Sequence, residues 1–307
     1  MCVILFIKSL GILFSFIEKI TRKIFVCIWR GQKSVIWLQR VLMQGSWEKL
    51  ECNLGNKNKS LWVLGNGPSL AAQLQEYLDA FLQHDIMCMN HFASTEYFEK
   101  LKPRYYVMVD PDFFGERYNC PLQEKKRVKE TFENIHKKLT WDMFLIIPIR
   151  AKKYKEFIKY VTSNNKIHVR YVSTVKFYGY NWLKKLLLDK QLCSFGATDV
   201  LTSSLYSAIH MGYKDILVFG VEHGWHKQLI VTDNNEVAMQ NPHFYEKDAS
   251  YDKLDGCNIS DIFTSMAEAF KSYMELNEYC ITKGGKIRNA TPGSSIDAFE
   301  RVNFFFS

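Results

Sequence analysis

The chain has 307 residues, of which 47% are hydrophobic and 23% are charged, and this length is enough to bury a sizeable core. No two of its eight cysteines lie within twenty residues of each other, which excludes a CxxC zinc or redox motif and predicts a reducing compartment without disulfides. The formal net charge of +8 fits an anionic partner: nucleic acid, anionic lipid or a phosphorylated substrate.

The first 47 residues are expected to form an apolar, helical N-terminal unit. Lys8 interrupts its first apolar run and Glu18 ends the second, so it lacks the roughly twenty apolar residues that are needed to cross a bilayer. No small-residue cleavage site follows, which argues against a secretory signal. Gly11 and Gly31 are expected to divide the helix into pieces.

Seven basic residues of segment 1–43 share one face of a helix. At about 100° per residue they fall within an arc of about 100°, and large apolar residues fill the remainder. These residues are Lys8, Lys19, Arg22, Lys23, Arg30, Lys33 and Arg40. The pattern is typical of a helix in an anionic membrane interface and predicts a cytoplasmic protein peripheral to the inner face of the plasma membrane. The alternative is a helix packed on the catalytic domain or on a partner subunit. The sequence leaves open whether the protein forms a homo-oligomer.

Nucleic acid is not expected as a partner. The positive charge is concentrated on the apolar N-terminal helix. The second basic segment, 127–138, also carries Glu130 and Glu133, as a solvated helix face does.

Strand-like and helical segments alternate through residues 61–303, after a polar segment, 48–60, that is expected to be a linker. Strands are expected at 61–64, 86–89, 105–109, 143–147, 167–172, 215–219 and 286–288. Helices are expected at 70–82, 94–101, 127–138, 152–160, 198–210 and 262–282. This alternation predicts an α/β fold, in which helices cover both faces of a parallel sheet.

Residues 222–260 interrupt the alternation. They are polar, show little periodicity and carry His223, His226 and His243. A long irregular insertion in a compact domain is typical of a lid or a binding loop. We therefore expect the second substrate, the acceptor, to bind there.

The sequence Gly65-Asn66-Gly67-Pro68-Ser69 follows a strand and opens a helix. The two glycines allow a tight turn and a close approach of the backbone to a ligand, and Pro68 suits a first helical turn. The free N–H groups of that turn favour an anion such as phosphate. With Asn66 and Ser69 as hydrogen-bonding groups, the loop predicts a nucleotide site, although it lacks the lysine of a P-loop and the third glycine of a dinucleotide fingerprint.

Two further expected strands end in polar residues, Asn90 and Asp110. Ligands of open α/β sheets bind beyond the carboxyl ends of strands, so Asn90 suits a base or ribose edge and Asp110 a ribose hydroxyl. Asp110 and Asp112 also have the spacing of a two-carboxylate metal site, where a metal neutralises a diphosphate leaving group. A nucleoside monophosphate can instead be stabilised by hydroxyl and backbone N–H groups. The motif leaves open both a diphosphate leaving group with a metal and a monophosphate leaving group without one.

The order of these motifs resembles a group of bacterial glycosyltransferases. The segments 65–70 (GNGPSL), 88–92 (CMNHF) and 109–114 (VDPDFF) are similar to the start of the lipooligosaccharide sialyltransferases and of the flagellin glycosyltransferases of the motility accessory factor group. Residues 211–222 and 289–294 resemble the family's later helix–strand unit and closing loop. The resemblance implies a Rossmann-like, single-domain GT-A-like fold and an inverting, metal-independent transfer from a CMP-sugar.

The resemblance also implies roles for individual residues. The expected donor-binding residues are Gly65, Asn66, Gly67, Pro68, Ser69, Asn90, Asp110, Thr198, Asp199, Glu222 and Ser294. Asp110 stands where the sialyltransferases have Asn. The family's general base is a histidine of the lid region, for which His243 is the candidate and His223 the runner-up. The family's phosphate-holding tyrosines have no matching counterparts, although Tyr245 and Tyr251 lie nearby.

These features predict a transferase without a resident cofactor or metal. Its donor would be a CMP-activated nonulosonic acid, such as sialic acid, or a Kdo-like sugar, and its acceptor a cell-surface glycan or glycolipid. One alternative is an archaeal-type 6-hydroxymethylpterin pyrophosphokinase, which would need Mg²⁺ and ATP and would use Asp110 and Asp112 as ligands. The other is a non-enzymatic nucleotide-binding subunit of a polysaccharide assembly complex.

Overall fold

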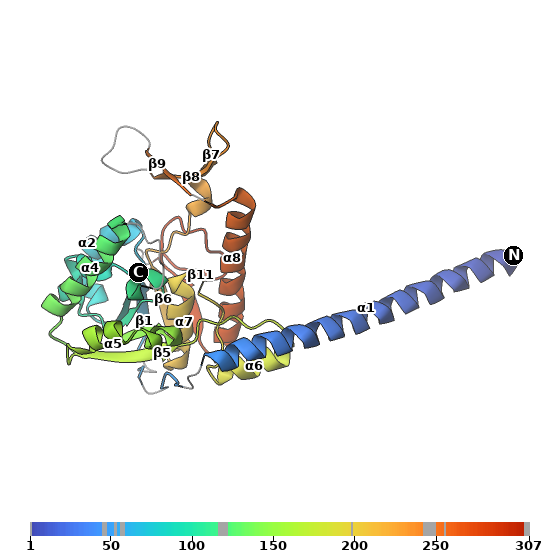
Figure 1. The fold of residues 1–307 in the computed structure, drawn as a ribbon, viewed down its shortest axis with the longest axis horizontal. Helices are drawn as coiled ribbons and strands as arrows, with labels where there is room; N and C mark the ends of the chain where they lie inside the picture. The colour runs from blue at the N-terminus through green and yellow to red at the C-terminus, as the bar shows by residue number, and fades with distance from the viewer. Residues whose placement is uncertain are drawn as a thin grey trace.

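A parallel β-sheet forms the centre of the molecule (Figure 1). The computed structural model describes residues 2–44, 48–51, 54–55, 59–115, 122–197, 199–241, 250–254 and 256–303. The strands of this sheet are β1 (Leu61–Leu64), β2 (Asp85–Met89), β3 (Tyr105–Val107), β4 (Met143–Pro148), β5 (Ile167–Val172), β6 (Asp215–Phe219), β10 (Lys286–Asn289) and β11 (Glu300–Arg301). Within the described residues they pair in parallel in the order β11-β10-β6-β1-β2-β3-β4-β5.

Helices cover both faces of the sheet, so the predicted Rossmann-like α/β fold is confirmed. One core contains residues of α6 (Asn181–Asp189), α7 (Val200–His210) and α8 (Ile259–Thr282). The other contains residues of α2 (Ser69–Phe81), α3 (Tyr97–Leu101), α4 (Leu122–Lys138) and α5 (Lys155–Thr162). The short 3₁₀ segments η1 (Phe92–Ser94) and η2 (Pro111–Phe114) follow β2 and β3. A third, η3 (Ile149–Lys153), follows β4 and precedes α5.

Strand β1 illustrates why these sequences form central strands. All four of its residues are buried. Leu61 and Val63 belong to one core, and Trp62 and Leu64 to the other, because successive side chains of a strand point to opposite faces. A strand covered on both faces is apolar throughout, which explains the uninterrupted LWVL sequence.

The chain order of the sheet reverses at β1. Leu61 pairs with Asp85 of β2 on one side and with Ile216 of β6 on the other. The loops that follow β1 and β6 therefore lead to helices on opposite faces, and such a switch point leaves a crevice at the carboxyl ends of the strands.

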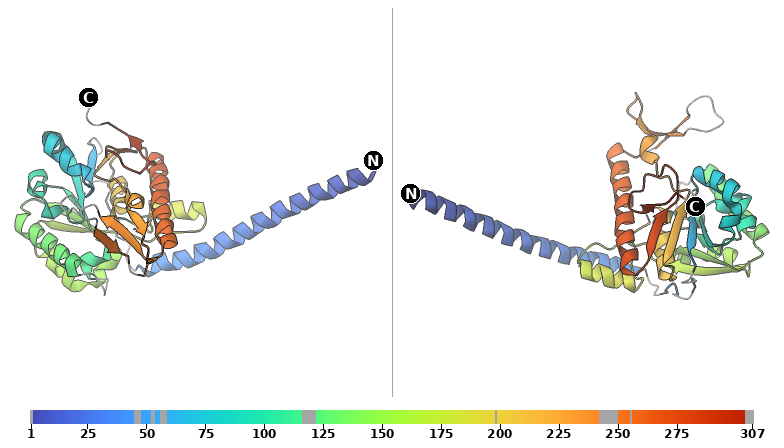
Figure 2. Two further views of the ribbon diagram at one scale, coloured as in Figure 1. Left: turned by 90° about the horizontal axis from the view of Figure 1, so that it is seen from above. Right: turned by 180° about the vertical axis from the view of Figure 1, so that it is seen from behind.

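The helix α1 (Cys2–Met43) is continuous and extends far from the rest of the molecule (Figures 1 and 2). The expectation that Gly11 and Gly31 divide it was wrong. A glycine in a helix interior costs only about 1 kcal/mol, and long apolar stretches surround each of them. No helix in the described part of the chain is long and apolar enough to cross a membrane.

The last turns of α1 are docked on the domain. The Ser34 Oγ accepts a hydrogen bond from the Tyr180 backbone N–H at 3.0 Å, Trp37 packs against Tyr178, and Val41 is buried. The C-terminal end of α1 is therefore packed on the domain, as the alternative to a membrane-surface helix predicts.

The polar segment after α1 also lies against the domain. The backbone N–H and C=O of Leu50 bond to the side chain of Gln191 at 2.7 and 2.9 Å, and the Gly55 N–H donates to the Met211 carbonyl. Leu50 and Leu54 are buried. Where it is described, this segment is thus fixed by hydrogen bonds and apolar contacts.

The insertion contains a second sheet, so the expectation of irregular structure was wrong, while its role as a lid or binding loop stays a prediction. Among the described residues, β7 (Leu229–Val231), β8 (Val237–Asn241) and β9 (Ser250–Lys253) pair in antiparallel fashion, after the 3₁₀ segment η4 (Trp225–Lys227). This small sheet projects from the main body (Figure 1). Its strands are short, and their sequences LIV, VAMQN and SYDK do not alternate between apolar and polar residues, which is why no period-two pattern marked them.

Candidate functional site

Two adjoining cavities lie at the carboxyl ends of the central strands. The first has a volume of about 800 Å³ and is lined by the loops after β1, β2, β3 and β6, by the start of α7 and by Gly293. The second, of about 940 Å³, is lined by α2, η1, η2 and Arg127 of α4. Both cavities share Asn66, Gly67, Pro68, Asn90 and Asp110. The predicted glycine loop thus forms the wall between them.

The two glycines of that loop are required by protein packing. A Cβ at Gly65 would overlap the Gly220 carbonyl oxygen, and a Cβ at Gly67 would overlap the carboxylate of Glu222. The Gly67 N–H donates to the Gly220 carbonyl at 2.9 Å. The close approach that the glycines allow is therefore to the loop after β6, whereas a ligand was expected.

The carboxylate of Glu222 lies at the N-terminus of α2 and binds its first turn. Its Oε1 accepts a hydrogen bond from the Ser69 backbone N–H at 2.8 Å. A carboxylate at this place is stabilised by the helix dipole, as a phosphate would be. This N–H, which was expected to bind phosphate, is thus bonded to the protein's own anion. Ser69 lines neither cavity.

Asn66 and Asn90 present their carboxamides at the wall between the cavities. The Asn66 Nδ2 donates to the Met89 carbonyl at 3.2 Å, which fixes its orientation. Asn90 has a left-handed backbone, with φ of 52°, and its carbonyl accepts a hydrogen bond from the Tyr106 hydroxyl at 2.6 Å. The Asn90 Oδ1 is buried without a hydrogen-bond partner among the described residues. Buried acceptors are normally bonded, so this atom suits a ligand's N–H or O–H group.

Asp110 and Asp112 lie close together beyond β3. The Asp110 Oδ1 accepts a hydrogen bond from the Asp112 backbone N–H at 3.0 Å, so it caps η2. Asp110 lines both cavities and Asp112 lines the second. Within the described residues, no group of three or more histidine, cysteine or acidic side chains is arranged to hold a metal ion.

His223 lines the first cavity and is held by two aromatic residues. Its Nδ1 lies 2.7 Å from the hydroxyl of Tyr273 on α8, and its ring packs against Trp225 with 4.3 Å between the ring centroids. Its backbone is left-handed, with φ of 47°. A non-glycine residue in this conformation costs of order 1 kcal/mol, which surrounding contacts must offset.

Asp199 determines which way the hydrogen bond between Tyr273 and His223 runs. Burial raises the pKa of Tyr273 well above its ordinary value, and the charge of Asp199 and the hydrogen bond to its carboxylate raise this pKa further. We infer that the Tyr273 hydroxyl donates to that carboxylate and that its oxygen accepts from the Nδ1–H of His223. The neutral imidazole then carries its lone pair on Nε2, which has no hydrogen bond among the described residues.

The imidazole is neutral at ordinary pH. Burial lowers the pKa of His223, and the charges of Asp199 and Glu222 oppose this effect without reversing it. A neutral ring that carries a lone pair and lines a cavity can accept a proton.

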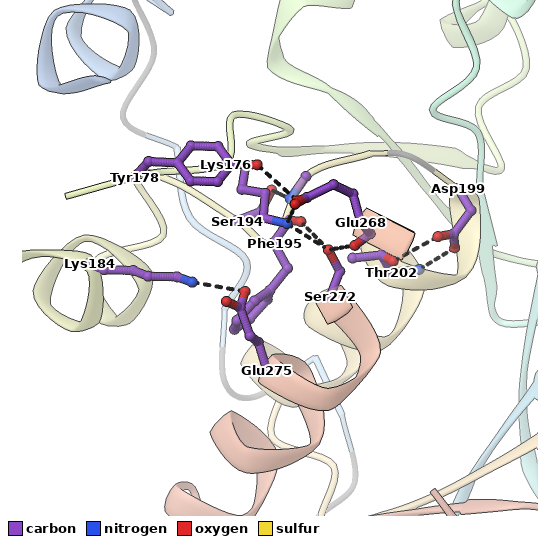
Figure 3. A network of polar contacts seen from close by, with 11 residues as sticks. Lys176, Tyr178, Lys184, Ser194, Phe195, Asp199, Thr202, Glu268, Ser272 and Glu275 are labelled. Atoms are coloured by element: carbon purple, nitrogen blue, oxygen red, sulfur yellow. Dashed lines mark hydrogen bonds and ion pairs between the residues drawn. The ribbon is translucent and has the colours of Figure 1, made fainter. Parts of the chain in front are cut away.

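Asp199 is itself fixed at the start of α7. Its carboxylate accepts hydrogen bonds from the Thr202 backbone N–H at 2.9 Å and from the Thr202 hydroxyl at 3.0 Å (Figure 3). The same view shows Lys176, whose Nζ donates to Glu268 at 2.7 Å and to the Ser272 hydroxyl at 3.0 Å. The Lys176 ammonium thus links the segment after β5 to α8, the helix that carries Tyr273.

The second cavity is more aromatic than the first. Phe92, Tyr97 and Phe113 line it together with His91. The Nδ1 of His91 lies 2.7 Å from the Thr131 hydroxyl, and its ring packs against Phe113. A cavity with flat apolar side chains and a hydrogen-bonding wall suits a ring system.

The structure brings most of the predicted site residues to one place. Those that line the cavities are Gly65, Asn66, Gly67, Pro68, Asn90, Asp110, Asp199, Glu222 and His223. Ser294 lines neither: it is buried, and its hydroxyl donates to the Val221 carbonyl and accepts from Asn289, which ties the loop after β10 to the loop after β6. Thr198, His243 and Tyr245 lie outside the described residues.

Sequence reasoning missed Tyr273, Trp225 and Lys227. Trp225 and Lys227 line the first cavity, and their place within the insertion that carries the histidines was the available signal. Tyr273 lies 50 residues after His223 in the middle of a helix, and nothing in its local sequence distinguishes it from a core tyrosine.

No protein-family model and no curated protein matches this sequence. Among solved structures, the chain is similar to one titled "Structure of MAf glycosyltransferase from Magnetospirillum magneticum AMB-1", with 11% sequence identity and a TM-score of 0.47. The similarity covers 84% of this chain and 35% of that one, so the chain spans about a third of its neighbour's length. At this level of similarity, nothing about the activity of this chain follows from that of the neighbour.

Proposed function

We propose that this protein is a glycosyltransferase that moves a sugar from a CMP-activated donor to a hydroxyl of a glycan acceptor. The observation that carries the proposal is His223, a neutral imidazole oriented by Tyr273 and Asp199 at the wall of the first cavity. The resemblance of the loops that hold Asn66, Asn90 and Asp110 to those of CMP-sugar transferases supports the choice of donor.

In the proposed complex the nucleoside lies in the second cavity and the sugar in the first. The unpartnered Asn90 Oδ1 would accept from the exocyclic amino group of cytosine, and Asp110 from a ribose hydroxyl. Lys227, which lines the first cavity, would pair with the carboxylate of a nonulosonic or Kdo-like acid. A donor that spans both cavities would pass over the loop from Asn66 to Pro68.

The proposed reaction is a direct displacement. The acceptor oxygen bonds to the anomeric carbon while the bond from that carbon to the phosphate oxygen breaks, and the electron pair leaves with CMP. The proton of the acceptor hydroxyl passes to the Nε2 of His223, and the imidazolium that forms is stabilised by the nearby charges of Asp199 and Glu222. Attack opposite to the leaving group inverts the anomeric centre.

Calorimetry with CMP, CDP, UDP and ATP, with and without EDTA, tests the donor. We expect CMP to bind with an affinity that EDTA leaves unchanged. Asn90→Gly should weaken this binding about tenfold, since it deletes the carboxamide but tolerates the left-handed backbone. Silence toward CMP with metal-dependent binding of ATP would overturn the proposal and favour the pyrophosphokinase alternative, with Asp110 and Asp112 as ligands.

Transfer or hydrolysis of CMP-sialic acid, with pseudaminic, legionaminic and Kdo donors as further probes, tests the base. His223→Gln should lower kcat by at least about a hundredfold while CMP binding is retained. The matched control is His226→Gln, because His226 is exposed and does not line the first cavity. Equal activities of the two variants would remove His223 from the mechanism. CMP binding without turnover of any donor would favour the non-enzymatic binding subunit.

A further inference from the structure

The helix α1 presents large apolar side chains to solvent along the whole part for which side chains are described. Phe25 is 68% exposed, Val35 60% and Met43 83%. The same holds for Ile17, Ile20, Ile24, Ile28, Trp29, Ile36 and Leu42. An apolar surface of this length marks an interaction site, since soluble monomers rarely expose one.

The exposed apolar side chains lie on the side of α1 that faces away from the domain. At about 100° per residue, the docked residues Ser34, Trp37 and Val41 occupy an arc of about 60°. Ile24, Phe25, Ile28, Val35, Ile36, Leu42 and Met43 fall in an opposite arc of about 120°. One continuous apolar face thus runs along the helix with the domain behind it.

Positive charge borders this apolar face. Between residues 17 and 43 the basic residues are Lys19, Arg22, Lys23, Arg30, Lys33 and Arg40, and the acidic residue is Glu18. At about 100° per residue, Arg22, Lys33 and Arg40 fall beside the apolar face on one side, whereas Lys19, Lys23 and Arg30 fall on the side of the docked residues. The occupant of the face must therefore accept a wide apolar surface and carry negative charge.

These two demands argue against a second copy of α1 as the occupant. Two helices pair through a narrow seam, whereas the apolar arc of α1 is wide and includes Phe25 and Ile36. Arg22, Lys33 and Arg40 border this face, and Glu18 is the acidic residue that a second copy of this stretch would bring to pair with them.

We propose that α1 lies flat on an anionic lipid bilayer, with its apolar face in the headgroup region and the domain on the water side. Phe25, Ile28 and Val35 would enter the acyl boundary, while the side chains of Arg22, Lys33 and Arg40 beside them reach the anionic headgroups. The helix spans about 63 Å at 1.5 Å per residue, so it can bind many headgroups at once. The proposal does not depend on the transfer reaction.

Co-sedimentation of the full chain with vesicles tests this surface. We expect binding to vesicles of phosphatidylcholine and phosphatidylglycerol, a decrease on adding salt, and little binding to phosphatidylcholine alone. The variant Phe25→Asp/Ile28→Asp should partition at least tenfold more weakly. Its matched control is Val231→Asp/Ile281→Asp, which places two carboxylates at apolar positions of similar exposure on β7 and α8.

A second variant, Arg22→Glu/Arg40→Glu, reverses two exposed charges beside the apolar face and leaves the apolar side chains in place. It should lose the preference for anionic vesicles. Binding that neither variant weakens would overturn the proposal, as would a chain that ignores vesicles. A concentration-dependent dimer that Phe25→Asp/Ile28→Asp abolishes, seen by sedimentation velocity without vesicle binding, would assign the face to a second copy and also overturn it.

Discussion

The hydroxyl of Tyr273 selects the tautomer of His223 in the proposed site. It donates to Asp199 and accepts from Nδ1–H, which leaves the lone pair of the ring on Nε2. Without this hydroxyl either ring nitrogen can carry the proton, and the ring is free to turn on Trp225. A base that depends on a tautomer needs such a partner.

Tyr273→Phe should therefore lower kcat about tenfold and leave KM nearly unchanged, since one hydrogen bond contributes about 1 kcal/mol. Because burial lowers the pKa of His223, the wild-type rate should rise with pH below the ordinary histidine value of about 6.5 and be flat above neutral pH. His223→Gln should abolish this acid limb. A steady-state pH profile of the three proteins checks both points, and a rate that falls as pH rises toward 7 would contradict them.

Part of this site could be predicted from single residues. Asn90 and Asp110 were found because parallel strands end at one edge of a sheet, so that polar residues after strands must meet there. Donor binding by Ser69 stays a prediction, and the sequence did not reveal that its backbone N–H bonds to the carboxylate of Glu222, 153 residues later. Tyr273 depends in the same way on tertiary packing, because only the docking of α8 brings it to His223.

At the scale of elements, α8 is held by two ion pairs that differ in burial. The Lys176–Glu268 pair joins it to the segment after β5, and the Lys176 side chain is 9% exposed. The Lys184–Glu275 pair joins it to α6, and the Lys184 side chain is more exposed, at 20%. A buried ammonium that loses its partner carries an unpaired charge, which costs more than the loss of a solvated pair.

Glu268→Ala should therefore lower the free energy of unfolding by about 2–3 kcal/mol, and the matched Glu275→Ala by less than about 1 kcal/mol. The hydrogen bond from Lys176 holds the pKa of Glu268 below its ordinary value of 4.5. This contribution is present above pH 4.5 and is lost as pH falls through the lowered pKa, so the two variants should converge in acid. Urea unfolding at several pH values measures the difference, and equal losses at neutral pH would refute the ranking.

The alternation of apolar segments predicted the main strands because each is buried on both faces and reads as an apolar run. Helix ends were less accurate: α4 begins five residues before its predicted start, and the expected helices at 94–101 and 152–160 each begin as a 3₁₀ segment. The helix α6 and the strand β11 were missed, as were the strands of the small sheet. These elements are short, and their stability comes from packing that no local pattern reports.

At the scale of the molecule, α1 combines a docked end with a projecting one (Figure 2). Ser34 and Val41 are buried against the domain, whereas residues 17–26 are exposed on all sides. Helical hydrogen bonds without tertiary packing open locally at little cost.

Hydrogen exchange of the full chain in dilute buffer should therefore show amides of residues 17–26 exchanging at least tenfold faster than those of residues 34–41. Both sets belong to one helix, so the docked turns serve as the internal control. Equal protection along α1 would mean that the projecting part is covered by another contact in solution.

The pairing of β1 with β6 has a consequence for synthesis. Leu61 leaves the ribosome about 150 residues before its neighbour Ile216, a delay of roughly ten to thirty seconds at ordinary elongation rates. The hydrogen-bonding edge of the central strand stays unfilled throughout that interval, while α1, which needs only local contacts, is already available. The nascent chain can therefore reach a lipid surface before its domain folds. The sheet is completed late, when β6 pairs with β1 at its centre.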